Sequence, residues 1–267
     1  MDEQSPQSDP ILAEGEVAVE AREPPPWGFW LTLVWSIAAL VATFIAQIVV
    51  VLVLVLQMIG RPQADLPQLA ERLASDGLVV SLAAIASCTV VVPILALASR
   101  IRGHRVRDYL GLKPLRRGEV TGALATLAVY IIVVDGITWL MGRDIVPPFM
   151  IEAYQTAGFL PLLIAALVVA APIFEELLFR GFAFRGLSCS WPGVWGAILI
   201  TSVGWAALHV QYDLYQMATI LFAGFLLGYW RWKTGSTSLT ILMHGMMNIV
   251  ATLETAIAIE VLGAGGP

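Results

Sequence analysis

Residues 28–60 have the sequence GFWLTLVWSIAALVATFIAQIVVVLVLVLQMIG, which contains no Asp, Glu, Lys or Arg. A membrane-spanning helix needs about 20 apolar residues to cross roughly 30 Å of hydrocarbon. This stretch is long enough for one tilted span. The whole chain of 267 residues is 58% hydrophobic and 13% charged, whereas a soluble domain is roughly 25% charged. The sequence therefore predicts an integral membrane protein.

Six further charge-poor windows follow the first one. All but the window 214–230, which is short, are long enough for a membrane helix, and the third of these six continues through Glu175, Glu176 and Arg180. We therefore predict an all-α fold, a polytopic membrane helix bundle of about seven transmembrane helices. The six windows are residues 77–99, 120–141, 153–174, 186–212, 214–230 and 234–253.

The distribution of basic residues predicts the orientation. Between the second and third windows, residues 100–118 contain seven Lys or Arg residues, and such loops stay in the cytoplasm. The N-terminus is then cytoplasmic, and we expect a multi-pass protein of the plasma membrane if the source is bacterial. His104 lies in this basic loop, and we expect it to be solvated. We expect the basic loop first to set the topology and second to contact anionic membrane lipid.

Three further regions complete the predicted domain organisation. Residues 1–27 hold seven acidic residues, one Arg and several prolines, which is typical of a disordered acidic cytosolic tail. Residues 28–150 are expected to form accessory transmembrane helices, and residues 151–267 a second transmembrane unit. The net charge of −5 argues against a nucleic-acid partner.

Polar residues enter three of the later windows, where each is unfavourable unless it is paired or functional. On a helix, Glu176 and Arg180 are four residues apart in the favourable order for an ion pair. Glu175 points about 100° away from Glu176 and is free to face another group. The three motifs are PIFEELLFR at 172–180, WAALH at 205–209 and HGMMN at 244–248.

Depth in the membrane suggests that the three motifs meet. Counted from the cytoplasmic helix ends at a rise of 1.5 Å per residue, they lie about 18, 22 and 14 Å deep. All three motifs therefore reach the middle of the bilayer, where they can form one buried polar site.

The order EExxxR, then [FW]xxxH, then HxxxN on successive spans resembles the CAAX protease and bacteriocin-processing family (CPBP, also called Abi). This family includes the CAAX prenyl endopeptidases of the Ras-converting type and bacterial intramembrane proteases. The resemblance covers residues 160–262 and implies that residues 151–267 form a four-helix catalytic transmembrane core. The one departure is Trp205 in place of the more frequent Phe. It implies an intramembrane endopeptidase that acts on a membrane-associated or lipidated protein or peptide.

The chemistry of amide hydrolysis assigns a role to each residue. Hydrolysis needs a water molecule, a base that activates it and donors for the oxyanion. Glu175 is the expected base, with His209 sharing or orienting the water. His244 and Asn248 offer N–H donors to the tetrahedral intermediate.

Glu176 and Arg180 complete the candidate catalytic set as an ion pair that fixes the helix and holds the local charge. Use of a metal stays open at this point, because Glu and His also bind zinc. If zinc is used, its candidate ligands are Glu175, His209 and His244. The sequence lacks the HExxH motif of common zinc proteases.

Two alternatives from other functional classes remain. The first is a catalytically inactive membrane scaffold or immunity protein of the same fold. The second is a small ion- or proton-coupled transporter that uses Glu175, Glu176 and Arg180 as a relay.

Overall fold

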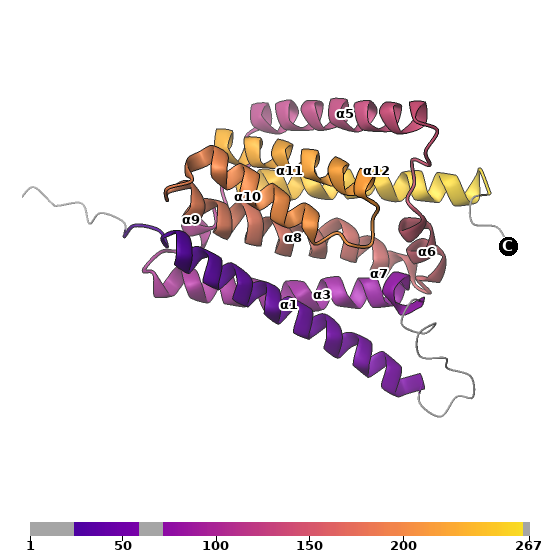
Figure 1. The fold of residues 1–267 in the computed structure, drawn as a ribbon, viewed down its shortest axis with the longest axis horizontal. Coiled ribbons are helices and arrows are strands. Elements are labelled where there is room, and N and C mark those ends of the chain that lie inside the picture. Colours follow the sequence, from indigo (N-terminus) through magenta and orange to yellow (C-terminus); the bar gives the residue numbers. More distant parts are fainter. Residues whose placement is uncertain (1–23, 59–71, 264–267) are drawn as a thin grey trace, which may run out of the picture.

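The structure is a computed structural model that describes residues 24–58 and 72–263. Every regular element in these two ranges is helical, which confirms the predicted all-α bundle (Figure 1). The elements are α1 (Phe29–Met58), α3 (Gly77–Ile101), α4 (Val106–Tyr109), α5 (Arg117–Leu140), α6 (Pro148–Thr156), α7 (Leu160–Ala165), η1 (Ala166–Ala170), α8 (Ala171–Glu176), η2 (Leu177–Ala183), α9 (Phe184–Ser188), α10 (Gly193–Ala207), α11 (Leu214–Thr234) and α12 (Thr237–Glu260).

Five helical segments of the described chain are long and apolar enough to cross a membrane. They are α1, α3, α5, α12 and the rod of α7 to α9 at Leu160–Ser188. Of the other two predicted spans, α10 is apolar but has only 15 residues, and α11 is not among the five. These two helices pack against each other. The polytopic bundle is confirmed, and length and composition support five of the seven predicted spans.

The boundaries of two predicted spans are wrong. The window 153–174 begins too early, because Gly158 adopts a φ of +63° and separates α6 from the rod. The window 186–212 is too long at both ends. The helix α10 begins at Gly193, which has a φ of +64°, and ends at Ala207. Residues 208–213 therefore form a connection to α11 rather than a helical turn.

Two π-helical segments, η1 and η2, flank α8 within the rod. A π-helical turn accommodates an extra residue, shifts the side chains that follow it around the axis and often occurs at functional sites. The α8 segment between them carries Glu175 and Glu176. These turns therefore set the direction in which the two carboxylates leave the rod.

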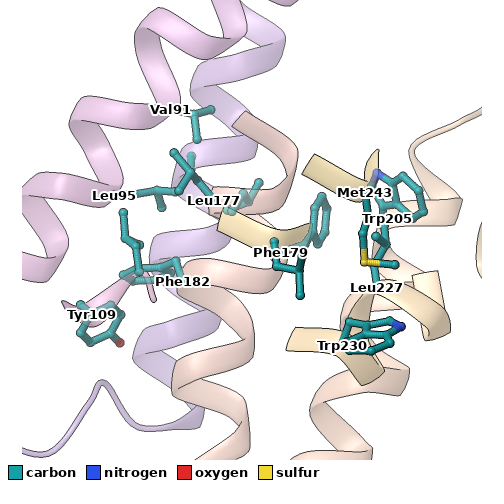
Figure 2. Packing of buried hydrophobic residues seen from close by; sticks show 14 of the residues in the cluster. Val91, Leu95, Tyr109, Leu177, Phe179, Phe182, Trp205, Leu227, Trp230 and Met243 are labelled. Carbon is teal, nitrogen blue, oxygen red and sulfur yellow. The ribbon is translucent and has the colours of Figure 1, made fainter. Parts of the chain in front are cut away.

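The largest hydrophobic core lies where the rod meets its neighbours (Figure 2). Leu177 and Phe182 from the rod pack with Leu95 from α3, while Trp205 from α10 and Met243 from α12 lie on the other side. Outside this core, α1 and α5 expose many large apolar side chains, as expected for surfaces that face lipid. The core therefore holds α10 and α12 against the rod that carries Glu175.

The basic loop between α3 and α5 is folded against the bundle. Tyr109 is completely buried and packs on Phe182, with ring centroids 5.4 Å apart. His104 is 6% exposed and meets the Tyr109 ring edge-on. The expectation that His104 is solvated is therefore wrong, because the aromatic contacts of the loop cover it. Burial raises the pKa of Tyr109 to about 12.

Candidate active site

Glu175 reaches from α8 to Trp205 on α10. The indole Nε1–H of Trp205 donates a hydrogen bond of 2.5 Å to Glu175 Oε2. The Trp205 side chain is buried, whereas that of Glu175 is 16% exposed. Because an indole N–H can only donate, this contact fixes the carboxylate by one oxygen. The other oxygen, Oε1, is left for a further partner.

Behind Glu175 lies a fully buried ionic network. Arg180 Nη1 donates to Glu176 Oε1 at 2.9 Å, and both side chains have no exposed area. This is the ion pair that the four-residue spacing predicts. The Arg180 guanidinium also lies over the Trp205 ring, with Cζ 4.5 Å from the centroid. Arg180 therefore supports both Glu176 and the tryptophan that holds Glu175.

His244 on α12 connects the two glutamates. Its Nδ1 lies 3.1 Å from Glu176 Oε1, and its Nε2 lies 3.9 Å from Glu175 Oε2. An ionised carboxylate only accepts hydrogen bonds, so Nδ1 is the donor toward Glu176. This contact orients the ring and directs Nε2 toward Glu175.

His209 lies beyond the end of α10, which differs from the prediction that it sits on a helix. Its Nδ1 is 2.8 Å from the backbone oxygen of Trp205. Because a carbonyl oxygen only accepts, Nδ1 carries the proton and Nε2 of the neutral ring has a free lone pair. The imidazole also stacks on Tyr212, with an interplanar angle of 18°.

The short connection that carries His209 is fixed at its C-terminal end. Asp213 caps α11 by accepting from Gln216 N at 2.8 Å, and the side chain of Gln216 accepts from Asp213 N. Arg143 Nη1 donates to Asp213 Oδ2 at 2.7 Å. The hydrogen bond from Gln216 N, with Arg143 as a second cause, lowers the pKa of Asp213.

Asn248 lies one helical turn after His244 and is held by η1. Its Nδ2 donates to the backbone oxygen of Leu167 at 2.7 Å. The π-helical geometry of η1 leaves backbone carbonyls without their usual α-helical partners, and Asn248 satisfies one of them. One N–H of the amide is thereby used, and the second N–H remains to donate.

These side chains meet in one cavity of about 900 Å³. Of the six site residues predicted from the sequence, four line the cavity: Glu175, His209, His244 and Asn248. The other two, Glu176 and Arg180, form the buried network beside it. Most of the remaining lining is apolar. The cavity extends to the end of the bundle formed by the α5–α6 and α10–α11 connections, opposite the basic loop.

Two aromatic residues of the cavity were not predicted as members of the site. The sequence indicated Trp205 only as part of a motif, and its contact with Glu175 depends on how α10 packs against the rod. Tyr212 gave no signal, although it stacks on His209 and lines the same cavity. Burial and, secondly, the charge of Glu175 raise the pKa of Tyr212, so its hydroxyl stays protonated.

The donor geometry does not fit the zinc alternative. Within residues 24–58 and 72–263, no three His, Cys, Asp or Glu side chains are placed to hold a metal ion. The hydrogen bonds of Nδ1 leave Nε2 as the one free ligand atom of His209 and of His244, and these two atoms do not converge with a carboxylate of the described chain in a group of three ligands. We therefore assign no step to a metal.

Comparison with known proteins identifies the segment that contains this site. Residues 157–250 match the family model described as type II CAAX prenyl endopeptidase Rce1-like. No curated protein and no solved structure matches the chain. The matched segment includes all three motifs that line or support the cavity. Residues 157–250 are therefore similar to an Rce1-like domain, and this match supports the resemblance of the three motifs to the CAAX protease and bacteriocin-processing family.

Proposed function

We propose that the protein is an intramembrane endopeptidase that hydrolyses a peptide bond of a membrane-associated or lipidated protein or peptide. The observation that carries this proposal is the meeting of Glu175, His209, His244 and Asn248 in one cavity among apolar helices. The Rce1-like match supports protease activity for the same segment. A large, mostly apolar cavity with a few convergent polar groups is the usual form of such a site.

Water activation is assigned to Glu175. Trp205 holds Oε2 of this carboxylate, so Oε1 is the oxygen available to accept a proton from water. His209 Nε2, which has a free lone pair, accepts the second hydrogen of the same water and orients it. The hydroxide formed in this way attacks the carbonyl carbon of the substrate. Glu175 then passes its proton to the nitrogen that leaves.

The negative oxygen of the tetrahedral intermediate is assigned to His244 and Asn248. His244 Nε2 donates when the ring is protonated, and Glu176 stabilises this imidazolium through Nδ1. The free N–H of Asn248 supplies the second donor, while its bond to Leu167 keeps the amide in place. Fixed donors of this kind stabilise the transition state without reorganisation.

Glu176 and Arg180 are positioning residues in this scheme. They lie behind the cavity, have no exposed area and make no contact with a substrate placed in it. Arg180 neutralises Glu176, and Glu176 in turn orients His244. Their pairing explains how a carboxylate can remain in this apolar position.

Cleavage of fluorogenic peptides by the purified full chain in detergent tests the proposal. The peptide panel includes matched sequences with and without a lipidated cysteine near the C-terminus. In H₂¹⁸O, water-dependent hydrolysis places one ¹⁸O in the new carboxyl group of the product. If no peptide of the panel is cleaved and the reconstituted protein conducts ions in liposomes, the transporter alternative is correct and the proposal is wrong.

A further inference from the structure

A second cavity, of about 450 Å³, lies at the end of the bundle opposite the candidate active site. It is formed by the loop between α3 and α5 together with one residue of α9. Four of its eight lining residues are basic, and the only acidic one is Asp108. The basic residues are Arg105, Arg107, Lys113 and Arg185.

The loop that forms this pocket is held in a fixed shape. Thr237, at the start of α12, donates from its Oγ1 to Leu110 O at 2.6 Å and from its backbone N to Gly111 O at 2.8 Å. Gly111 has a φ of +67°, and a Cβ added there would approach Arg231 Nη2 to 2.8 Å. A loop that served only as a topology signal would need none of these contacts. The backbone that carries these positive charges is therefore fixed.

None of the four cations of the pocket forms an ion pair with Asp or Glu in the part of the chain that the structure describes. Arg107 and Lys113 instead donate to backbone oxygens, those of Leu112 and Thr234. The Nε of Arg185 is buried and has no hydrogen-bond partner. An anion in the pocket would relieve the mutual repulsion of these charges and supply the missing acceptor.

The position of the pocket indicates which anions it meets. Two candidate membrane spans, α3 and α5, end and begin at Ile101 and Arg117 on either side of the loop. The loop therefore lies at the surface of the bilayer, at the end of the bundle where α9 is seen in Figure 1. This is the level of the phospholipid phosphates, and guanidinium groups bind phosphate oxygens in pairs.

From this geometry we propose that the pocket of Arg105, Arg107, Lys113 and Arg185 binds a phosphate-bearing anion. The phosphate group can belong to the headgroup of an anionic phospholipid or to a soluble phosphate compound. Both sources present the same oxygens to the four cations, so the test must separate them. This site is independent of the proposed peptidase chemistry, because it shares no lining residue with the larger cavity.

Binding is measured on the purified full chain in a neutral detergent by titration and thermal shift. The probes are dioctanoyl phosphatidylglycerol, dioctanoyl phosphatidylcholine, glycerol phosphate and inorganic phosphate. We expect saturable binding of at least one of the three anionic probes and little effect of the zwitterionic phosphatidylcholine. If glycerol phosphate or inorganic phosphate binds as tightly as phosphatidylglycerol, the source is soluble; if only the lipid binds, the source is the membrane.

Two double variants locate the site. Arg107→Gln with Lys113→Gln removes two charges from the pocket, and Arg116→Gln with Arg117→Gln removes two charges from the same loop outside it. We expect the first pair to weaken binding by about tenfold or more and the second by less than about threefold. The side chains of all four residues are exposed, so the fold should survive. If the pocket pair does not fold, Arg107→Lys replaces it and should weaken binding because it keeps the charge but loses the paired donors.

Two outcomes would overturn this proposal. Equal losses in the two double variants would show that general surface charge, not the pocket, attracts the probe. Absence of saturable binding of every phosphate probe would contradict it directly.

Discussion

Replacement of Arg180 by Ala should destabilise the protein strongly, because it leaves Glu176 as an unpaired carboxylate with no exposed area. Removal of one partner from a buried ion pair costs about 3–5 kcal/mol. The variant also loses the hydrogen bond to Gly224 O and the contact with the Trp205 ring. For a chain of this size, we expect a fall in Tm on the order of 10 °C.

Two further variants show whether the buried charge is the cause. In the double variant Glu176→Gln with Arg180→Met, no charge is stranded, so Tm should lie well above that of Arg180→Ala. Activity should stay low, because His244 loses its anionic partner. Arg143→Ala breaks an ion pair in which both side chains are more than 40% exposed, and it should lower Tm much less.

Thermal unfolding in one detergent, monitored by intrinsic tryptophan fluorescence, compares the four proteins. Equal losses of Tm in Arg180→Ala and Arg143→Ala would contradict the claim that the unpaired buried charge of Glu176 destabilises the protein. This claim is also refuted if the double variant is no more stable than Arg180→Ala, because the cost would then come from lost packing and not from an unpaired charge.

Three other predictions concern the site, its connection and the orientation. His209→Ala should abolish peptide cleavage, while Asn248→Ala should keep a residual rate about 100- to 1,000-fold below wild type; equal residual rates, measured with one peptide, would contradict the assigned roles. Because the pKa of Asp213 is lowered, its cap stabilises the protein at neutral pH, and this stabilisation is lost as the pH falls through the pKa, below about pH 4. The Tm deficit of Asp213→Ala should therefore shrink on acidification, and Asp213→Asn should keep most of the cap. A deficit that does not change with pH would contradict this. If the basic loop is cytoplasmic, the exposed Cys189 should resist impermeant thiol reagents in intact cells. In a background without Cys189, the variant Asp144→Cys should react with the same reagents. The reverse labelling would invert the orientation.

Much of the fold follows from where charges are absent in the sequence. The charge-free stretch of α1 and the alternation of apolar windows with Lys- and Arg-rich connections place most helices within a few residues. The i, i+4 spacing of Glu176 and Arg180 was sufficient to predict their ion pair, because this contact is local to one helix. This prediction, which depends on the spacing within one helix, therefore agrees with the structure.

Predictions that depend on helix ends or tertiary packing were less successful. The charge-free window continues past Ala207, so it could not show that α10 ends before His209. In the structure Leu208 is the C-cap of α10, and Asp213 caps the next helix. The burial of His104 depends on an aromatic contact inside a loop whose composition is polar. The hydrogen bond from Trp205 to Glu175 joins residues 30 positions apart, and no pattern within either helix encodes it.

The most direct test of the central claim is the rate of peptide cleavage by Glu175→Gln. This variant keeps an acceptor oxygen for Trp205 but removes the base, while Glu152→Gln makes the same change at an exposed position outside the cavity. We expect no measurable turnover by Glu175→Gln at an unchanged Tm and full activity of Glu152→Gln. Turnover by Glu175→Gln at the wild-type rate would contradict the assignment of Glu175 as the residue that activates water.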